Sequence, residues 1–173
     1  IIGVVIQSGL ATKVSKLIAN VGSTYLIVAL LITMLGCMLL GMALPTVAAY
    51  LVANVLFVPT LIGLDIQPLQ ANMFVFYFGI MAQITPPVCV ASFTAAGIAG
   101  ADSMKTGLTG FAYALVAFLV PFIFIYDPSI LLIGTPLEIV KGTLILFLGT
   151  YLLASGMAGF FLVPLNRIER TIL

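Results

Sequence analysis

The sequence contains no histidine and no tryptophan, and charged residues make up only 6% of it. All five carboxylates lie at the ends of apolar segments: Asp65, Asp102, Asp127, Glu138 and Glu169. General acid–base catalysis therefore has no buried candidate, and we expect neither enzymatic activity nor a cofactor. The net charge of +1 gives no reason to expect a nucleic acid as partner. Cys37 and Cys89 lie in apolar runs, where buried thiols are expected rather than a disulfide or metal ligands.

Long apolar stretches dominate what is present. Hydrophobic residues make up 63% of the sequence, and no charged residue occurs from Leu17 to Leu64 or from Ile66 to Ala101. About 20 apolar residues in a helix suffice to cross the hydrocarbon core of a bilayer. The composition therefore predicts an all-α integral membrane protein with several transmembrane helices, for which the lipid bilayer is a partner.

Polar and charged residues divide the chain into segments. Residues 10–20 are amphipathic at helical spacing, which fits a helix in the membrane interface or a solvated connector. The chain opens with Ile-Ile-Gly and closes soon after a spanning segment, so we expect a fragment of a longer protein. The predicted segments are 1–22, a partial helix and the amphipathic helix; 23–63, an interrupted hairpin; 64–101, a broken helix; 102–126, a transmembrane helix; 127–136, a connecting loop; and 137–173, a transmembrane helix with a basic end.

Two adjacent prolines interrupt the second charge-free run, at Ile84-Thr85-Pro86-Pro87. A proline removes a backbone donor, clashes with the carbonyl four residues earlier and moves the preceding residue out of the helical region. The helix therefore has to break. An unpaired backbone group in hydrocarbon costs several kcal/mol, so such a break persists where protein buries it or where it lines a polar cavity.

A second interruption lies in the first charge-free run, at Gly41-Met42-Ala43-Leu44-Pro45-Thr46. A lone proline in a membrane helix can be an ordinary kink. Two Gly/Pro-interrupted apolar segments in one membrane chain are instead typical of a secondary-transporter site near the bilayer midplane. We therefore predict that the two breaks form one solute site.

The apolar arms around Pro45 are expected to hold roughly 12 to 16 residues each, fewer than a crossing needs. This first unit is then either one long broken crossing or a re-entrant hairpin, and we expect the hairpin. The second unit, around Pro86, is expected to be a broken crossing.

Thr46, Tyr50 and Asn54 recur every four residues and share one helical face. A stripe of hydroxyl, phenol and amide groups in an apolar segment is expected to face protein or water rather than lipid. It is compatible with a permeation path and with hydrogen-bonded helix packing.

A half-helix is expected to start inside the membrane after each break, with free N–H groups and the positive end of its dipole facing the gap. An anion would be stabilised there. The candidate substrate-binding residues are Pro45, Thr46, Tyr50, Asn54, Pro86 and Pro87.

The half-helix before each break ends in unpaired carbonyls, which are hard oxygen ligands suited to Na⁺. The candidate ligands are the carbonyls of Gly41, Ala43 and Ile84 together with the hydroxyls of Thr46 and Thr85. No ionisable side chain lies inside either interrupted unit, which favours Na⁺ as coupling ion over a side-chain proton relay.

Four stretches together resemble the C-terminal half of the large permease subunit of a TRAP transporter, the tripartite ATP-independent periplasmic carriers. They are Gly-Met-Ala-Leu-Pro-Thr-Val-Ala-Ala-Tyr at 41–50, Ile-Gly-Leu-Asp-Ile-Gln-Pro at 62–68, Ile-Thr-Pro-Pro-Val at 84–88 and Ala-Ala-Gly-Ile-Ala-Gly at 95–100. Tyr126-Asp127-Pro128 and the Leu-rich stretch after it are similar to the fused-permease branch that works with TAXI-type binding proteins.

The resemblance implies an elevator-type carrier in the bacterial inner membrane. It also implies Na⁺-coupled uptake of an organic anion, a carboxylate, delivered by a TAXI-type periplasmic substrate-binding protein. Further partners would be the missing N-terminal half and the small-subunit helices of the same permease. By the same resemblance, a role in the ion and substrate sites falls on Gly41, Pro45, Thr46, Thr85, Pro86 and Pro87. Two other classes remain: a channel or pore subunit whose breaks form a filter, and a structural membrane anchor.

Overall fold

The computed structural model describes residues 9–22, 25–158, 160–161 and 163–164. It divides into two compact units, residues 1–107 and 108–173. Residues 1–8, the first part of the predicted segment 1–22, and the predicted basic end with Arg167 and Arg170 lie outside the described residues.

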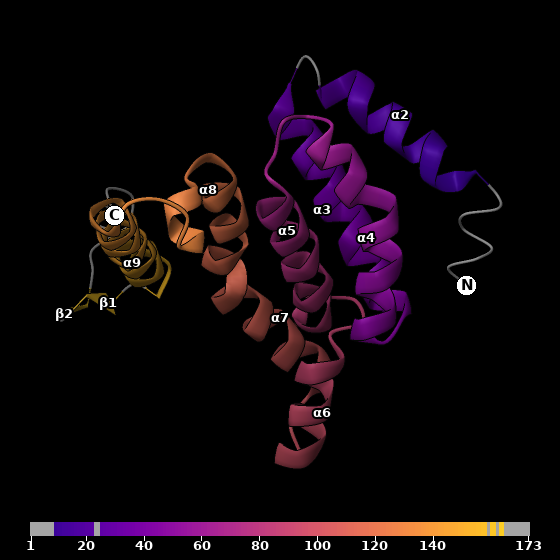
Figure 1. Cartoon of the computed structure of the whole chain (residues 1–173). Coiled ribbons are helices and arrows are strands. Elements are labelled where there is room, and N and C mark those ends of the chain that lie inside the picture. The colour runs from indigo at the N-terminus through magenta and orange to yellow at the C-terminus, as the bar shows by residue number, and fades with distance from the viewer. Residues whose placement is uncertain (1–8, 23–24, 159, 162, 165–173) are drawn as a thin grey trace. The chain divides into compact units, whose positions relative to one another are not determined.

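The first unit is a bundle of helices in which α3, α4 and α5 lie side by side (Figure 1). Its core is apolar, and Leu30, Leu61, Phe74, Val75 and Phe78 are fully buried. The elements are α2 (Leu10–Gly22), α3 (Leu26–Ala43), α4 (Thr46–Ile62), α5 (Pro68–Met81), the 3₁₀ turn η1 (Ala82–Ile84) and α6 (Val90–Ala99).

Helix α2 covers the predicted amphipathic stretch. Its Ile18 is buried, whereas Lys13 and Lys16 are exposed. The hydroxyl of Thr60 on α4 donates to Ser15 Oγ on α2 at 2.6 Å. Helix α2 is thereby attached to the bundle along one face.

Helices α3 and α4 form an antiparallel hairpin with its tip at Leu44 and Pro45. Gly36 of α3 packs against the ring of Phe57 on α4, and Gly22 before α3 packs against Leu64 after α4. Residues close to the tip on one side thus contact residues close to it on the other, and residues far from the tip contact residues far from it. The two helices therefore run in opposite directions. Leu44 is extended, with φ −130° and ψ 153°, as expected of a residue before proline.

The arms of this hairpin are longer than predicted. Helix α3 has 18 residues and α4 has 17, with Pro59 inside α4. A proline inside a helix removes a backbone donor and tends to end or kink the helix. The last turn continues because Thr60 and Leu61 are buried against the bundle, so tertiary packing outweighs the local preference.

The second unit begins at Leu108, within α7 (Ser103–Ala114). It continues through the 3₁₀ helix η2 (Leu115–Leu119) and α8 (Val120–Tyr126). The helix predicted at 102–126 is thus present, but its centre tightens to 3₁₀ geometry. Pro121 lacks the N–H that the carbonyl of Ala117 would receive in an α-helix, and the N–H of Val120 reaches this carbonyl instead.

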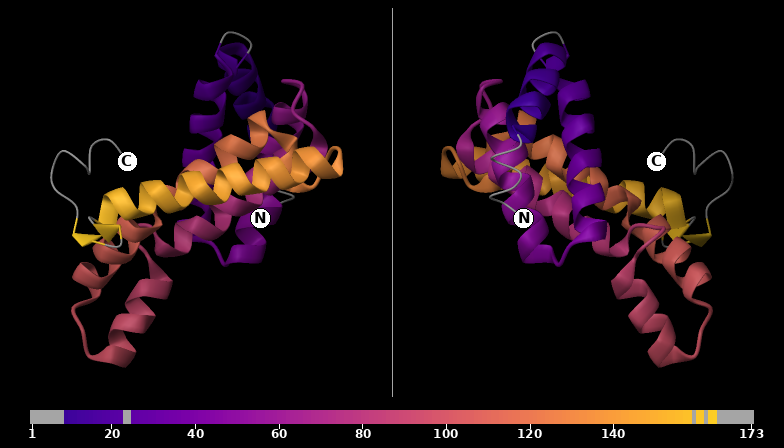
Figure 2. Two further views of the ribbon diagram at one scale, coloured as in Figure 1. Left: turned by 90° about the vertical axis from the view of Figure 1, so that its left-hand side faces the viewer. Right: turned by 90° about the vertical axis from the view of Figure 1, so that its right-hand side faces the viewer.

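The predicted loop at 127–136 holds a further 3₁₀ turn, η3 (Pro128–Leu131), in which the Asp127 carboxylate accepts from the N–H of Ser129 at 3.0 Å. Helix α9 (Pro136–Ala158) is one uninterrupted helix of 23 residues (Figure 2). The two-residue strands β1 (Phe160–Phe161) and β2 (Val163–Pro164) pair after it.

Within the described residues, three helical stretches are long and apolar enough to cross a membrane: α3, the stretch Ser103–Tyr126 and α9. Apart from the four residues of β1 and β2, the regular structure there is helical. The all-α membrane fold predicted from the sequence is confirmed.

Candidate functional site

The two breaks predicted from the prolines meet in the first unit. Helices α3 and α5 run parallel, so their C-terminal ends lie together. A Cβ placed on Gly41 would lie 2.6 Å from the carbonyl oxygen of Gly79 and 2.6 Å from Ala82 Cβ. Glycine at this position is what allows the end of α3 to touch the end of α5.

A hydrogen bond joins the breaks at the same place. The side-chain amide of Gln83 donates from Nε2 to the carbonyl of Gly41 at 3.1 Å. In a continuous helix this carbonyl would accept from the N–H of residue 45, which is absent because residue 45 is proline. The carbonyl of Leu40 still has its helical partner, Leu44 N–H, at 3.0 Å. The next two carbonyls, of Met42 and Ala43, accept no hydrogen bond from a described residue.

At the second break, the hydrogen bonds come mainly from residues of the same segment. Thr85 is extended, with φ −99° and ψ 125°, and its N–H turns to the carbonyl of Ala82 at 3.3 Å. The carbonyl of Met81 loses its helical donor by this turn and accepts instead from the Thr85 hydroxyl at 2.8 Å. The carbonyl of Ile84 accepts nothing from the described residues. The peptide bond between Pro86 and Pro87 is cis.

Thr85 is 6% exposed. Because its hydroxyl hydrogen is used on Met81, the oxygen has lone pairs left over for an acceptor role. A cation could use these lone pairs without breaking the bond to Met81. The geometry at Thr85 is therefore compatible with the predicted ligand role.

The helices that follow the breaks begin without side-chain caps. Helix α4 has Pro45 as N-cap and α6 has Cys89, and neither side chain accepts a hydrogen bond from its helix. Helix α3, which begins after Tyr25, is also uncapped. By contrast, side chains accept at the N-termini of α5, α7 and α9, where the acceptors are Gln70, Asp102 and Glu138. The first N–H groups of α4 and α6 therefore donate to no described residue.

Two residues of the stripe predicted on α4, Tyr50 and Asn54, form a hydrogen-bonded cluster with Asn72 of α5. Asn54 Nδ2 donates to Asn72 Oδ1 and, at 3.2 Å, to Tyr50 Oη, while Tyr50 Oη donates to Asn72 Oδ1 at 3.2 Å. Asn72 Nδ2 donates to the carbonyl of Pro68 at 2.7 Å. The ring of Tyr50 also packs edge-on against Phe76, with centroids 5.3 Å apart. In this arrangement Tyr50 and Asn54 hold α4 against α5, and Thr46 does not join them.

The remaining predicted site residues lie around the breaks with different exposure. Ala43, Pro45 and Pro87 are exposed, whereas Thr46, Ile84 and Pro86 are half-buried. Sequence reasoning missed two amides that turned out to make the inter-helix contacts, Gln83 and Asn72. Both stand in a charge-free run, where an amide needs a partner, and this signal could have identified them.

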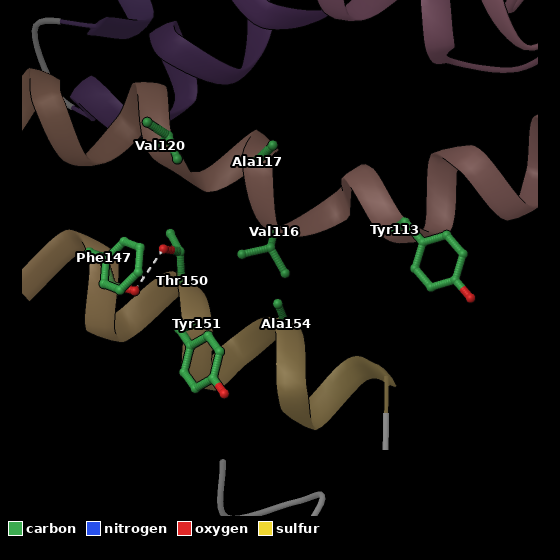
Figure 3. Close-up of a pocket in the computed structure, with 8 residues that line it drawn as sticks. All are labelled: Tyr113, Val116, Ala117, Val120, Phe147, Thr150, Tyr151 and Ala154. Atoms are coloured by element: carbon green, nitrogen blue, oxygen red, sulfur yellow. Dashed lines mark hydrogen bonds between the residues drawn. The ribbon is translucent and has the colours of Figure 1, made fainter. Parts of the chain in front are cut away.

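The second unit carries a groove of about 430 Å³ between the α7–η2–α8 stretch and α9 (Figure 3). Its lining is largely apolar. The hydroxyl of Thr150 is engaged within α9, donating to the carbonyls of Leu146 at 2.8 Å and Phe147 at 3.1 Å. The groove resembles lipid-facing helix packing more than a site for a charged solute.

Comparison with known proteins identifies the family of the chain. No curated protein and no solved structure matches the chain. Residues 1–139 match the family described as tripartite ATP-independent periplasmic transporter, DctM component. The match contains both interrupted units and ends near the start of α9. It covers most of the sequence, and we conclude that the chain belongs to the DctM family of TRAP transporter large permeases, a family of multi-pass secondary transporters rather than enzymes.

Proposed function

We propose that the chain is part of a Na⁺-coupled permease that takes up organic anions bearing carboxylates. The observation that carries the proposal is the contact between the two breaks, where Gly41 touches Gly79 and Ala82 and accepts from Gln83. Two interrupted apolar segments that meet in this way are the arrangement expected of one solute site.

The cation in this proposal is bound by oxygen atoms at the breaks. The carbonyls of Ala43 and Ile84 have no hydrogen-bond donor among the described residues, and Thr85 Oγ1 keeps its lone pairs. The Gly41 carbonyl accepts one bond from Gln83 and has a second lone pair. Thr46, at the first turn of α4, supplies a further hydroxyl. Oxygens of this kind suit a hard cation.

The anion in this proposal is bound at the uncapped starts of α4 and α6. The first N–H groups of both helices donate to no residue of the described part of the chain, and the helix dipoles place partial positive charge there. Pro45, Pro86 and Pro87 create these helix starts. No Asp or Glu lies from Ile66 to Ala101 or from Leu17 to Leu64 to repel a carboxylate.

Family membership supports the rest of the proposal. A periplasmic binding protein would deliver the solute in the bacterial inner membrane, and the resemblance of Tyr126-Asp127-Pro128 to the fused-permease branch favours a TAXI-type partner. The hairpin α3–α4 and the broken segment α5–α6 would move as one body in an elevator-type cycle. The N-terminal half and small-subunit helices of the permease would complete the carrier.

Counterflow in liposomes tests this proposal. The intact permease is reconstituted with its binding protein, and labelled carboxylates are supplied with NaCl or with choline chloride. We expect exchange of a labelled carboxylate that requires both Na⁺ and unlabelled solute on the opposite side. Simple equilibration would identify a pore, and no flux with any carboxylate would leave only an anchoring role.

A further inference from the structure

The Gly41 carbonyl accepts from the Gln83 amide in place of an N–H at residue 45, which proline lacks. Gly41 O can only accept, so the amide must present its nitrogen to it, and the orientation of the Gln83 side chain is fixed by chemistry. Gln83 is half-buried and comes from η1, which follows a different helix of the first unit. A side chain from one interrupted segment thus replaces a backbone donor lost from the other.

We propose that Gln83 is a positioning residue that fixes the tip of the α3–α4 hairpin against the break after α5, and so sets the affinity of the site for its cation. This inference rests on the proposed function, since it assigns to Gln83 the alignment of carbonyls in a site shared by both breaks. Gln83 acts through Gly41. The carbonyls that follow on α3, those of Met42 and Ala43, are held in place by the same bond.

The packing around Gly41 explains why this bond is sensitive to its surroundings. With Gly79 O and Ala82 Cβ each 2.6 Å from where a Cβ would stand, the two segments are in direct backbone contact. Small shifts there change ligand distances at both breaks together. A hydrogen bond that suppresses such shifts improves cation binding by pre-organising the ligands.

Thermal unfolding of the intact permease in detergent measures this effect. NaCl replaces choline chloride at constant ionic strength, and the Na⁺ concentration giving half of the rise in Tm is determined. Gln83→Met keeps the length of the side chain and removes the donor. We expect this midpoint to rise about fivefold, the effect of one lost hydrogen bond on an equilibrium.

Gln70→Met is the matched control. Gln70 is a buried amide at the opposite end of α5, whose Oε1 accepts from the N–H of Gln67 at 3.3 Å. Its loss is expected to lower Tm and to leave the Na⁺ midpoint within about twofold of the wild type. If the Gln83→Met midpoint also stays within that range while the wild type responds to Na⁺, Gln83 does not position the site.

A second arm separates this inference from the proposed function. A wild type whose Tm does not respond to Na⁺ would contradict Na⁺ coupling, and the inference is then decided in choline chloride alone. Pro45→Ala restores an N–H at residue 45 that can reach Gly41 O as the helix continues. Gln83→Met should therefore lower Tm less in the Pro45→Ala background than in the wild type. An equal loss in both backgrounds would show that Gln83 does not replace the missing donor.

Discussion

At the break before Pro45, the carbonyl of Gly41 accepts from a side chain of another segment, Gln83. At the break before Pro86, the carbonyl of Met81 accepts from Thr85, four residues later in the same segment. The Gly41 carbonyl loses its helical donor because Pro45 has no N–H, whereas the Met81 carbonyl loses the N–H of Thr85 because the residue before Pro86 is extended. The hairpin tip therefore depends on its neighbour, whereas the second break supplies its own replacement. The comparison predicts that the contact between the breaks is the more fragile of the two arrangements.

A larger side chain at Gly41 should have the largest effect, because it separates the two breaks. Gly41→Val places side-chain atoms where the Gly79 carbonyl and Ala82 already lie, and backbone cannot move aside as a flexible side chain could. We expect a loss of about 3 kcal/mol in the free energy of unfolding of the intact permease, followed by thermal unfolding in detergent.

Gly79→Ala is the control from the other side of the contact. A Cβ at Gly79 meets nothing within 4 Å. Alanine in a helix interior is favoured over glycine by up to about 1 kcal/mol, so this variant should be neutral or slightly stabilising. Equal losses for both variants would contradict a close approach at Gly41.

Removing the hydroxyl of Thr85 tests the self-contained break. Thr85→Val keeps the shape of the side chain but removes the hydroxyl that donates to the carbonyl of Met81, and we expect a loss of about 1.5 kcal/mol in the free energy of unfolding. The same change removes a proposed cation ligand. Na⁺-activated uptake should therefore fall by a larger factor than the amount of folded permease does. Thr85→Ser, which retains the hydroxyl, should behave like the wild type. A Thr85→Val activation curve that overlays the wild-type curve would exclude Thr85 as a ligand.

A change in the hydrogen-bonded cluster between α4 and α5 should have the smallest effect on stability. Tyr50→Phe keeps the ring packing on Phe76 and removes the hydroxyl that contacts Asn54 and Asn72. We expect a loss of about 1 kcal/mol in the free energy of unfolding and an unchanged concentration of carboxylate at half-maximal uptake. If uptake affinity falls while stability is kept, Tyr50 lies on the permeation path, as the sequence alone also allowed.

The positions of the breaks could be predicted from the sequence because proline acts locally. Its missing N–H and its effect on the preceding residue agree with the extended conformations of Leu44 and Thr85. The all-α membrane class followed from composition in the same direct way. These features depend on short stretches of sequence and little else.

What escaped prediction depends on contacts between segments. Helix α4 passes through Pro59 because Thr60 and Leu61 are buried against other helices, which no local rule records. The partners of Gln83 and Asn72 lie 42 and 18 or 22 residues away. A stripe of polar residues on one helix indicated that a partner was needed, but it did not indicate that the partner was Asn72.

The central claim is that the two breaks form one site, and a double-mutant cycle on Thr46 and Thr85 tests it most directly. The concentration of Na⁺ that half-activates carboxylate uptake by the intact permease is measured for Thr46→Val, Thr85→Val and the double variant. Residues that share one ion are coupled, so the double variant should depart at least about threefold from the product of the two single fold-changes. Single effects that multiply to within about twofold would place Thr46 and Thr85 in separate sites and contradict the account.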